Sequence, residues 1–126
     1  MRGANEKEKN MKLLTKQQHQ TLLANGQKQD PVRGTPDEID FKPVVKLFNP
    51  NGAGTWLLTE IDPECHDIAF GLCDLGYPEL GSVSLTELAS FRGVFGLGIE
   101  RDRHWTAKKT LNEYATEARK AGCIIA

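Results

Sequence analysis

Three capping boxes, in which Ser or Thr is followed three residues later by Glu or Gln, mark helix starts along the chain. They begin at Thr15, Ser84 and Thr110. We expect the first helix to end near Gly26 and the second near Gly93, because glycine suits the residue that follows a helix. The third helix carries an apolar stripe and two basic residues in its last turn, which favour the helix dipole. These three starts leave the segments between them for strands.

Apolar and β-branched runs between the first two helices predict strands. Residues 44–48 (VVKLF) and 55–61 (TWLLTEI) flank an Asn51-Gly52 step, which is a strong reverse-turn signal, so we predict that they form a hairpin. Residues 68–75 (IAFGLCDL) are almost continuously apolar, which favours a third strand in the centre of the sheet.

Two weaker strand signals follow. Residues 76–81 (GYPELG) are expected to form a turn that leads into a short strand at 82–84, and residues 99–105 (IERDRHW) are a polar candidate strand. The resulting order is helix, three or four strands, helix, strand, helix. It predicts an α+β fold in which a small, mostly antiparallel sheet of four to five strands has about three helices packed on it.

The length of 126 residues is typical of one domain. Residues 1–10 (MRGANEKEKN) are almost wholly polar, so we predict that they form a disordered leader. A single domain is then predicted over residues 11–126. Residues 30–40 within it contain two prolines, a glycine and four acidic side chains, and are expected to form a long loop or linker.

The net charge of −1 is unevenly distributed. Residues 41–105 carry five basic and nine acidic side chains, which disfavours general nucleic-acid binding because proteins that hold duplex DNA usually have a basic face. The three cysteines are an odd number without a CxxC spacing, and no apolar run is long enough to span a bilayer. We therefore predict a cytoplasmic protein with free thiols, no membrane partner, no metal and no cofactor.

Several long strings of the chain are similar to those of one known family. They are PVVKLF at 43–48, TWLLTEIDP at 55–63, DIAFGLCDLG at 67–76, PELGSVSLTEL at 78–88 and ERD at 100–102. Together with LLT at 13–15 and the closing helix, they resemble DUF2958, a bacterial domain family of unknown function. The resemblance implies a protein of plasmids, integrative elements or phages, and it implies no activity and no catalytic residue.

The polar segment 99–105 is the first candidate for chemistry. If it is extended, Glu100, Asp102 and His104 lie on one face, because side chains alternate along a strand. Such a set could bind a divalent metal or act as acid and base. The favoured alternative is an edge strand whose charges discourage unwanted pairing.

Two carboxylates, Glu60 and Asp74, fall in otherwise apolar strand patterns. A carboxylate that faces a core costs several kcal/mol unless it is paired, so each should have a partner, such as Arg101 or a helix N-terminus. If their strands pair through a short turn, Glu60 lies near Ile68 and Asp74 near Trp56, which argues against a catalytic dyad. A salt bridge or a strand-end hydrogen bond is the favoured role.

Glu79 lies in the predicted turn after Asp74, where both could share a site with Arg101. An arginine flanked by acids can hold a phosphate or carboxylate ligand, or it can cross-link a loop, and the cross-link is favoured. Asp74, Glu79, Arg101 and Asp102 still form the best site hypothesis. It requires Asp74 and Arg101 to lie within about 10 Å, roughly one Debye length.

Three functions remain open. The first is a non-enzymatic accessory protein of a mobile element that binds a bacterial protein, with counter-defence as one such role, because an acidic surface can engage a basic partner. The second is a small metal-assisted or acid–base hydrolase that uses Asp74, Glu79, Asp102 and His104. The third and weakest is nucleic-acid binding through basic residues at the ends of the C-terminal helix, since a solvated helix face is the commoner role.

Overall fold

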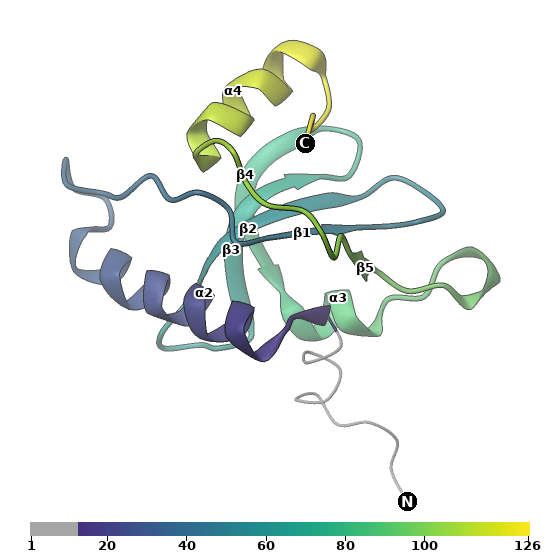
Figure 1. Cartoon of the computed structure of the whole chain (residues 1–126), viewed down its shortest axis with the longest axis horizontal. Coiled ribbons are helices and arrows are strands. Elements are labelled where there is room, and N and C mark those ends of the chain that lie inside the picture. The colour runs from purple at the N-terminus through teal and green to yellow at the C-terminus, as the bar shows by residue number, and fades with distance from the viewer. Residues whose placement is uncertain (1–12) are drawn as a thin grey trace, which may run out of the picture.

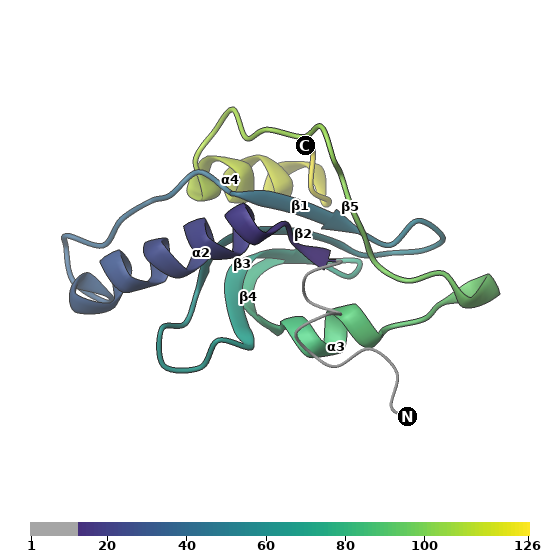
Figure 2. The same cartoon turned by 60° about the horizontal axis from the view of Figure 1, so that its bottom comes forward.

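The computed structural model describes residues 13–126 as a five-stranded sheet with helices on both of its faces (Figures 1 and 2). The elements in chain order are α2 (Lys16–Gln29), η1 (Asp30–Val32), β1 (Val45–Phe48), β2 (Thr55–Ile61), β3 (Ile68–Asp74), β4 (Pro78–Ser84), α3 (Leu85–Ser90), η2 (Val94–Gly96), β5 (Glu100–Arg101) and α4 (Leu111–Ala121).

All neighbouring strands are antiparallel, in the order β4-β3-β2-β1-β5. The α+β fold predicted from the sequence is therefore confirmed, as is the β1–β2 hairpin. β3 is paired on both sides, although the middle position belongs to β2. The sheet is built almost entirely from neighbours in sequence, and β5 alone crosses over to the far edge beside β1.

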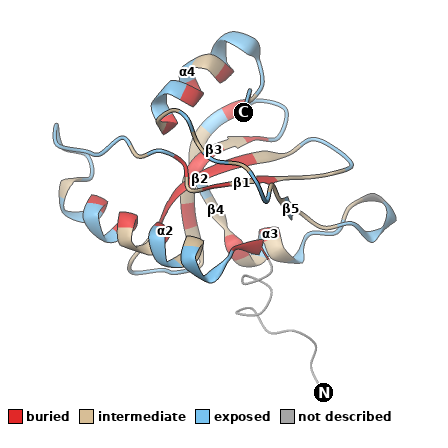
Figure 3. Ribbon diagram, in the orientation of Figure 1, coloured by how far each residue is buried: buried red, intermediate tan, exposed pale blue. Residues whose placement is uncertain are grey.

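Each face of the sheet has its own hydrophobic cluster, and the buried residues line the sheet and the inner sides of the helices (Figure 3). On one face, Leu22 of α2 and Leu85 of α3 pack with Leu58 of β2. On the other face, α4 packs on Leu57 of β2 and Leu72 of β3. We call these the α2 face and the α4 face. The alternation of side chains along β2 and β3 is what supplies both clusters.

Helix α2 continues past Gly26, where the sequence predicted its end, and stops at Gln29. A Cβ atom on Gly26 would lie 1.8 Å from the carbonyl oxygen of Ile61 in β2. Glycine is therefore needed here because the helix backbone crosses the strand closely, not because the helix terminates.

The three predicted helix starts are all observed. Thr15 and Thr110 form reciprocal capping boxes, and the Ser84 hydroxyl accepts a hydrogen bond from the amide of Glu87. Helix α3 is shorter than predicted and ends at Ser90, because Phe91 adopts an extended backbone. The Arg92 guanidinium then donates hydrogen bonds to the carbonyl oxygens of Ala89 and Phe91.

Two strands differ from the prediction in length. β4 begins at Pro78 rather than at residue 82, because the turn before it occupies residues 75–77 alone. β5 comprises two residues instead of seven. After Arg101 the chain turns, and the Trp105 amide donates a hydrogen bond to the Asp102 carbonyl.

Residues 30–40 contain the short η1 turn and otherwise form a loop, as expected. The predicted leader, residues 1–10, lies outside the described residues. In the described range, 13–126, no helix has the length and apolar character required to cross a bilayer.

Candidate functional site

A β-bulge in β2 decides where Glu60 points. Leu58 pairs with Gly71, whereas Glu60 pairs with Phe70, so that Thr59 is an extra residue in the ladder. Strict alternation from Leu58 would have placed Glu60 on the α2 face. The bulge moves it to the α4 face, beside Phe70, where its side chain is 4% exposed.

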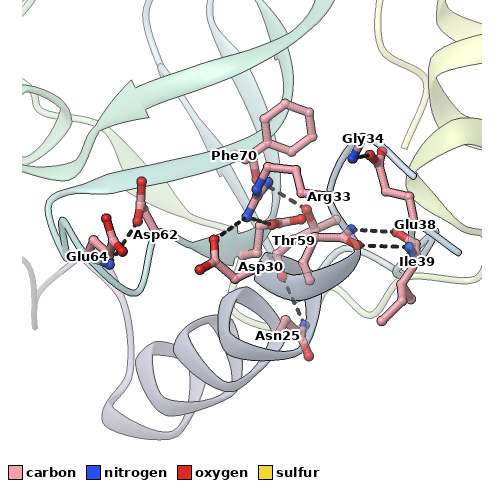
Figure 4. A network of polar contacts seen from close by, with 12 residues as sticks. Asn25, Asp30, Arg33, Gly34, Glu38, Ile39, Thr59, Asp62, Glu64 and Phe70 are labelled. Atoms are coloured by element: carbon pink, nitrogen blue, oxygen red, sulfur yellow. Dashed lines mark hydrogen bonds and ion pairs between the residues drawn. The ribbon is translucent and has the colours of Figure 1, made fainter.

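Glu60 is held by Arg33, which lies in the loop that follows η1. Figure 4 shows this arginine beside Asp30. Arg33 donates a hydrogen bond from Nη2 to Oε2 of Glu60 at 3.1 Å, and the same nitrogen lies 3.9 Å from Asp30. The sequence correctly required a partner for Glu60 but suggested Arg101 or a helix N-terminus, because a contact between a loop and a bulge leaves no local pattern. The observed ion pair fastens the loop at residues 30–40 to the sheet.

Asp74 occupies the end of β3, is 9% exposed and binds two backbone amides. Its Oδ1 accepts a hydrogen bond from Gly76 at 2.9 Å, and its Oδ2 accepts one from Ile124 at 3.0 Å. One carboxylate thus joins the β3–β4 turn to the segment after α4. This is the strand-end hydrogen bond that the sequence favoured for Asp74.

The structure does not bring Asp74 together with Arg101. β2 and β1 lie between β3 and β5, a separation of three strand spacings or about 14 Å. In addition, Arg101 pairs with Leu47 on the α2 face and donates to the Leu13 carbonyl at 3.1 Å, whereas Asp74 shares the α4 face with Leu72. The predicted distance limit of about 10 Å is exceeded.

Glu79 is a backbone neighbour of Asp74 but points to the opposite face. It pairs with Cys73, which packs on the α2-face cluster. Burial, followed by the nearby Glu79 carboxylate, raises the pKa of Cys73 to about 11. Glu79 is exposed, and the β4 register, which the sequence placed too late in the chain, explains why the expected cluster does not form.

Glu100, Asp102 and His104 do not form a common face, because the strand that would align them ends at Arg101. Asp102 pairs instead with Lys46 at 3.7 Å, and His104 is exposed. Nowhere in residues 13–126 do three His, Cys, Asp or Glu side chains gather in a way that could hold a metal ion. The residues proposed for a hydrolase are thus distributed between β3 and β4 on one side of the sheet and the segment after β5 on the other.

Asp67, which the sequence did not single out, organises the start of α3. Its carboxylate accepts hydrogen bonds from the Ser84 hydroxyl at 2.6 Å, the Thr86 amide at 2.8 Å and the Thr86 hydroxyl at 2.6 Å. Burial raises the pKa of Asp67, but these hydrogen bonds outweigh burial and lower the pKa below its usual value. Ser84 and Thr86 can be identified as the partners of Asp67 only once the pairing of β4 with β3 is known.

Three large exposed apolar side chains lie next in the chain to the two residues whose amides bind Asp74. Leu75 and Tyr77 lie in the β3–β4 turn and are 68% and 75% exposed, and Ile125, next to the bonded Ile124, is 56% exposed. We call Leu75, Tyr77 and Ile125 the end patch. The sequence signal for it is the presence of two large apolar residues beside Gly76 and Pro78, in a turn where polar residues are usual.

The comparison with protein families matches one model, described as a protein of unknown function (DUF2958), over residues 13–125. This range covers nearly the whole chain. The chain belongs to the DUF2958 family. No curated protein and no solved structure matches this DUF2958 chain significantly. The resemblance inferred from the sequence strings is therefore confirmed, and the site has to be interpreted from its own geometry.

Proposed function

We propose that this DUF2958 chain is a cytoplasmic accessory protein of a bacterial plasmid, integrative element or phage, and that it acts by binding another protein. The end patch carries the proposal, because its three apolar side chains are each more than half exposed. Large apolar side chains that are exposed on neighbouring segments are typical of interaction sites, and Asp74 binds both segments here. Asp74 forms hydrogen bonds to both segments that supply the patch, so these segments are already held in place. Binding a partner then costs less conformational entropy than it would for unrestrained segments.

The chemistry of the patch describes its partner. Tyr77 can bury an apolar ring while its hydroxyl stays hydrogen-bonded, which is why tyrosine is common among the residues that dominate binding energy. Exposed Glu79 follows two residues later, at the rim of the patch. The complementary surface is an apolar pocket bordered by Lys or Arg, and such a rim makes association moderately sensitive to salt.

The alternative functions have less support. The hydrolase residues are separated as described above, and Asp74 and Asp102 bind other partners instead of one another. For nucleic-acid binding, the basic character of α4 is reduced because Lys109 forms an ion pair with Glu117. Lys108, Arg119 and Lys120 are exposed, but Tyr114, whose hydroxyl accepts a hydrogen bond from the Lys108 amide, is buried and offers no open face for a base to stack on.

A comparison of three immobilised baits tests the proposal. Wild type, Leu75→Ser/Tyr77→Ser and the control Phe95→Ser, which removes an 89% exposed ring elsewhere, are incubated with lysate of a bacterium that carries the element. We expect a defined protein on wild type and on the control, and its loss from the double variant. With the purified partner, calorimetry should show that the double variant binds at least about 30-fold more weakly than wild type, in line with the loss of an anchor residue.

Circular dichroism and thermal melting establish that the double variant is folded, as expected for fully surface positions in a turn. The proposal is contradicted if wild type retains no defined protein at low salt. It is equally contradicted if the retained protein binds the double variant with the affinity of wild type.

A further inference from the structure

The two edges of the sheet are constructed differently. β5, at one edge, has two residues and lies within the charged sequence Glu100–Arg103. Short length and charge are devices that prevent an edge from pairing with another strand. β4, at the other edge, has seven residues, pairs with β3 without a bulge from end to end, and contains no Lys or Arg. Its one charged side chain is Glu79, and Pro78 occupies its first position, so residues 80–84 form a long regular edge without charge or proline.

The hydrogen-bond phase of β4 follows from one observed bond. The amide of Leu85, one residue after β4, donates a hydrogen bond to the carbonyl of Asp67, one residue before β3. The backbone groups of Leu85 therefore point toward the β3 side. Bonding direction alternates along an antiparallel ladder, so residues an even number away from Leu85 also bond β3. The remaining positions direct their backbone groups to the free edge; they are Pro78, Leu80, Ser82 and Ser84.

These outward groups are left open by the rest of the fold. No hydrogen bond from residues 13–126 reaches the backbone N–H or C=O of Leu80 or Ser82. Pro78 has no N–H and occupies an outward position at the start of the strand, so no hydrogen bond between β4 and β3 is lost there. The edge is thus a row of available donors and acceptors.

No contact within the described chain explains why position 81, at the centre of β4, is a glycine. A Cβ atom on Gly26 or Gly71 would collide with a carbonyl oxygen, at 1.8 and 1.9 Å, whereas one on Gly81 would meet nothing within 4 Å. The φ angle of Gly81 is not positive either. A glycine inside a strand weakens it, and often marks a place where another backbone approaches closely.

We propose that β4 pairs antiparallel with β4 of a second copy of the chain, with the two-fold axis at Gly81. In this register Leu80 faces Ser82 of the partner copy, and about six backbone hydrogen bonds form. Glu79 faces an apolar valine, so no like charges oppose each other. The closest approach of the strands coincides with the one position that has no side chain. This inference is independent of the proposed function, because it concerns the isolated protein.

Sedimentation velocity of the full chain tests the pairing, across about 1 to 200 µM, where a small interface of this kind associates. We expect a concentration-dependent dimer for wild type. Ser82→Pro removes an outward N–H without removing a bond to β3, and Ser82→Lys places a charge on the edge. Both should weaken dimerisation more than about tenfold, whereas the control Ser82→Thr retains it.

Disulfide formation tests the register. In the Cys65→Ser/Cys123→Ser background, Gly81→Cys should form an intermolecular disulfide under mild oxidation, because directly opposed residues of a non-hydrogen-bonded pair have Cα atoms about 4.5 Å apart. Ser82→Cys, which faces Leu80 of the other copy, should cross-link more slowly. A monomer at all concentrations, an undiminished dimer in both Ser82→Pro and Ser82→Lys, or faster cross-linking at position 82 overturns the proposal.

Discussion

Three carboxylates in or next to the sheet are held by three different kinds of donor: Glu60 by a guanidinium, Asp74 by two backbone amides, and Asp67 by hydroxyl groups and an amide. Each donor set fixes a different segment: the loop at residues 30–40, the end of the chain that follows α4, or the start of α3. Charged groups therefore position loops and helices around a sheet whose clusters are apolar.

Asp67→Asn should destabilise the protein by about 1 to 3 kcal/mol at pH 7, because the amide cannot accept all the bonds that the carboxylate accepts. The pKa of Asp67 is lowered by folding, so its contribution is present above the unfolded pKa of about 3.9 and is lost as pH falls through the lower folded value. Urea unfolding at pH 7 and pH 3 should therefore show a large difference from wild type at pH 7 and a smaller one at pH 3.

The control for Asp67 is Asp37→Asn, at an exposed carboxylate in the loop. It should change stability by less than about 0.5 kcal/mol at either pH. An equal difference at both pH values for Asp67→Asn would show that the ionised form of Asp67 gives no extra stability.

At the scale of elements, the helices depend on their first turns. Thr110→Ala removes the side-chain oxygen that accepts the Glu113 amide, and should cost about 1 kcal/mol. Thr116, on the exposed side of the same helix, donates to the Asn112 carbonyl, and Thr116→Ala should change stability by less than about 0.5 kcal/mol. Urea midpoints compare the two, and equal effects would contradict a specific role for the cap.

The helix starts were predictable because a capping box is complete within four residues. The ends of the elements were not, because they depend on contacts far along the chain. Gly26 lies inside α2 and not at its end, because the helix crosses the backbone of Ile61 in β2 too closely for a side chain. The residues after Arg101 leave the sheet because a turn follows β5. The sequence therefore identified the fold, and its range of four to five strands includes the observed five, but it placed several boundaries incorrectly.

The candidate site was less predictable than the fold for the same reason. The need for partners at Glu60 and Asp74 followed from the cost of burying a charge, and both have them. The identity of those partners depended on a one-residue bulge at Thr59 and on the path of the segment after α4. Neither leaves a periodic signal, so Arg33 and Ile124 could not be named in advance.

At the scale of the whole molecule, the sheet separates two clusters that share its strands, so opening either side exposes both. The labelling rate of Cys73 measures such opening, because Cys73 belongs to β3 and its side chain packs against the α2-face cluster. Its pKa of about 11 leaves little reactive thiolate at pH 8. In the Cys65→Ser/Cys123→Ser protein, an aromatic disulfide reagent should label Cys73 about 100-fold more slowly than an unfolded cysteine.

Added urea should raise the Cys73 labelling rate in proportion to the unfolded fraction measured by circular dichroism. Exposed Cys65 and Cys123, each retained singly, serve as controls that react rapidly in the folded protein. Rapid labelling of Cys73 without urea would mean that the α2 face opens independently of the rest.

The bond between Asp74 and Ile124 joins residues that are 50 positions apart in the chain. At the usual pace of translation, of 5 to 20 residues per second, Ile124 is added about 3 to 10 seconds after Asp74. β1 to β4 are all complete before that moment, so the sheet can form while one oxygen of Asp74 is still bound to water. The end patch thus acquires its third side chain last, after the strands that support it have already been synthesised.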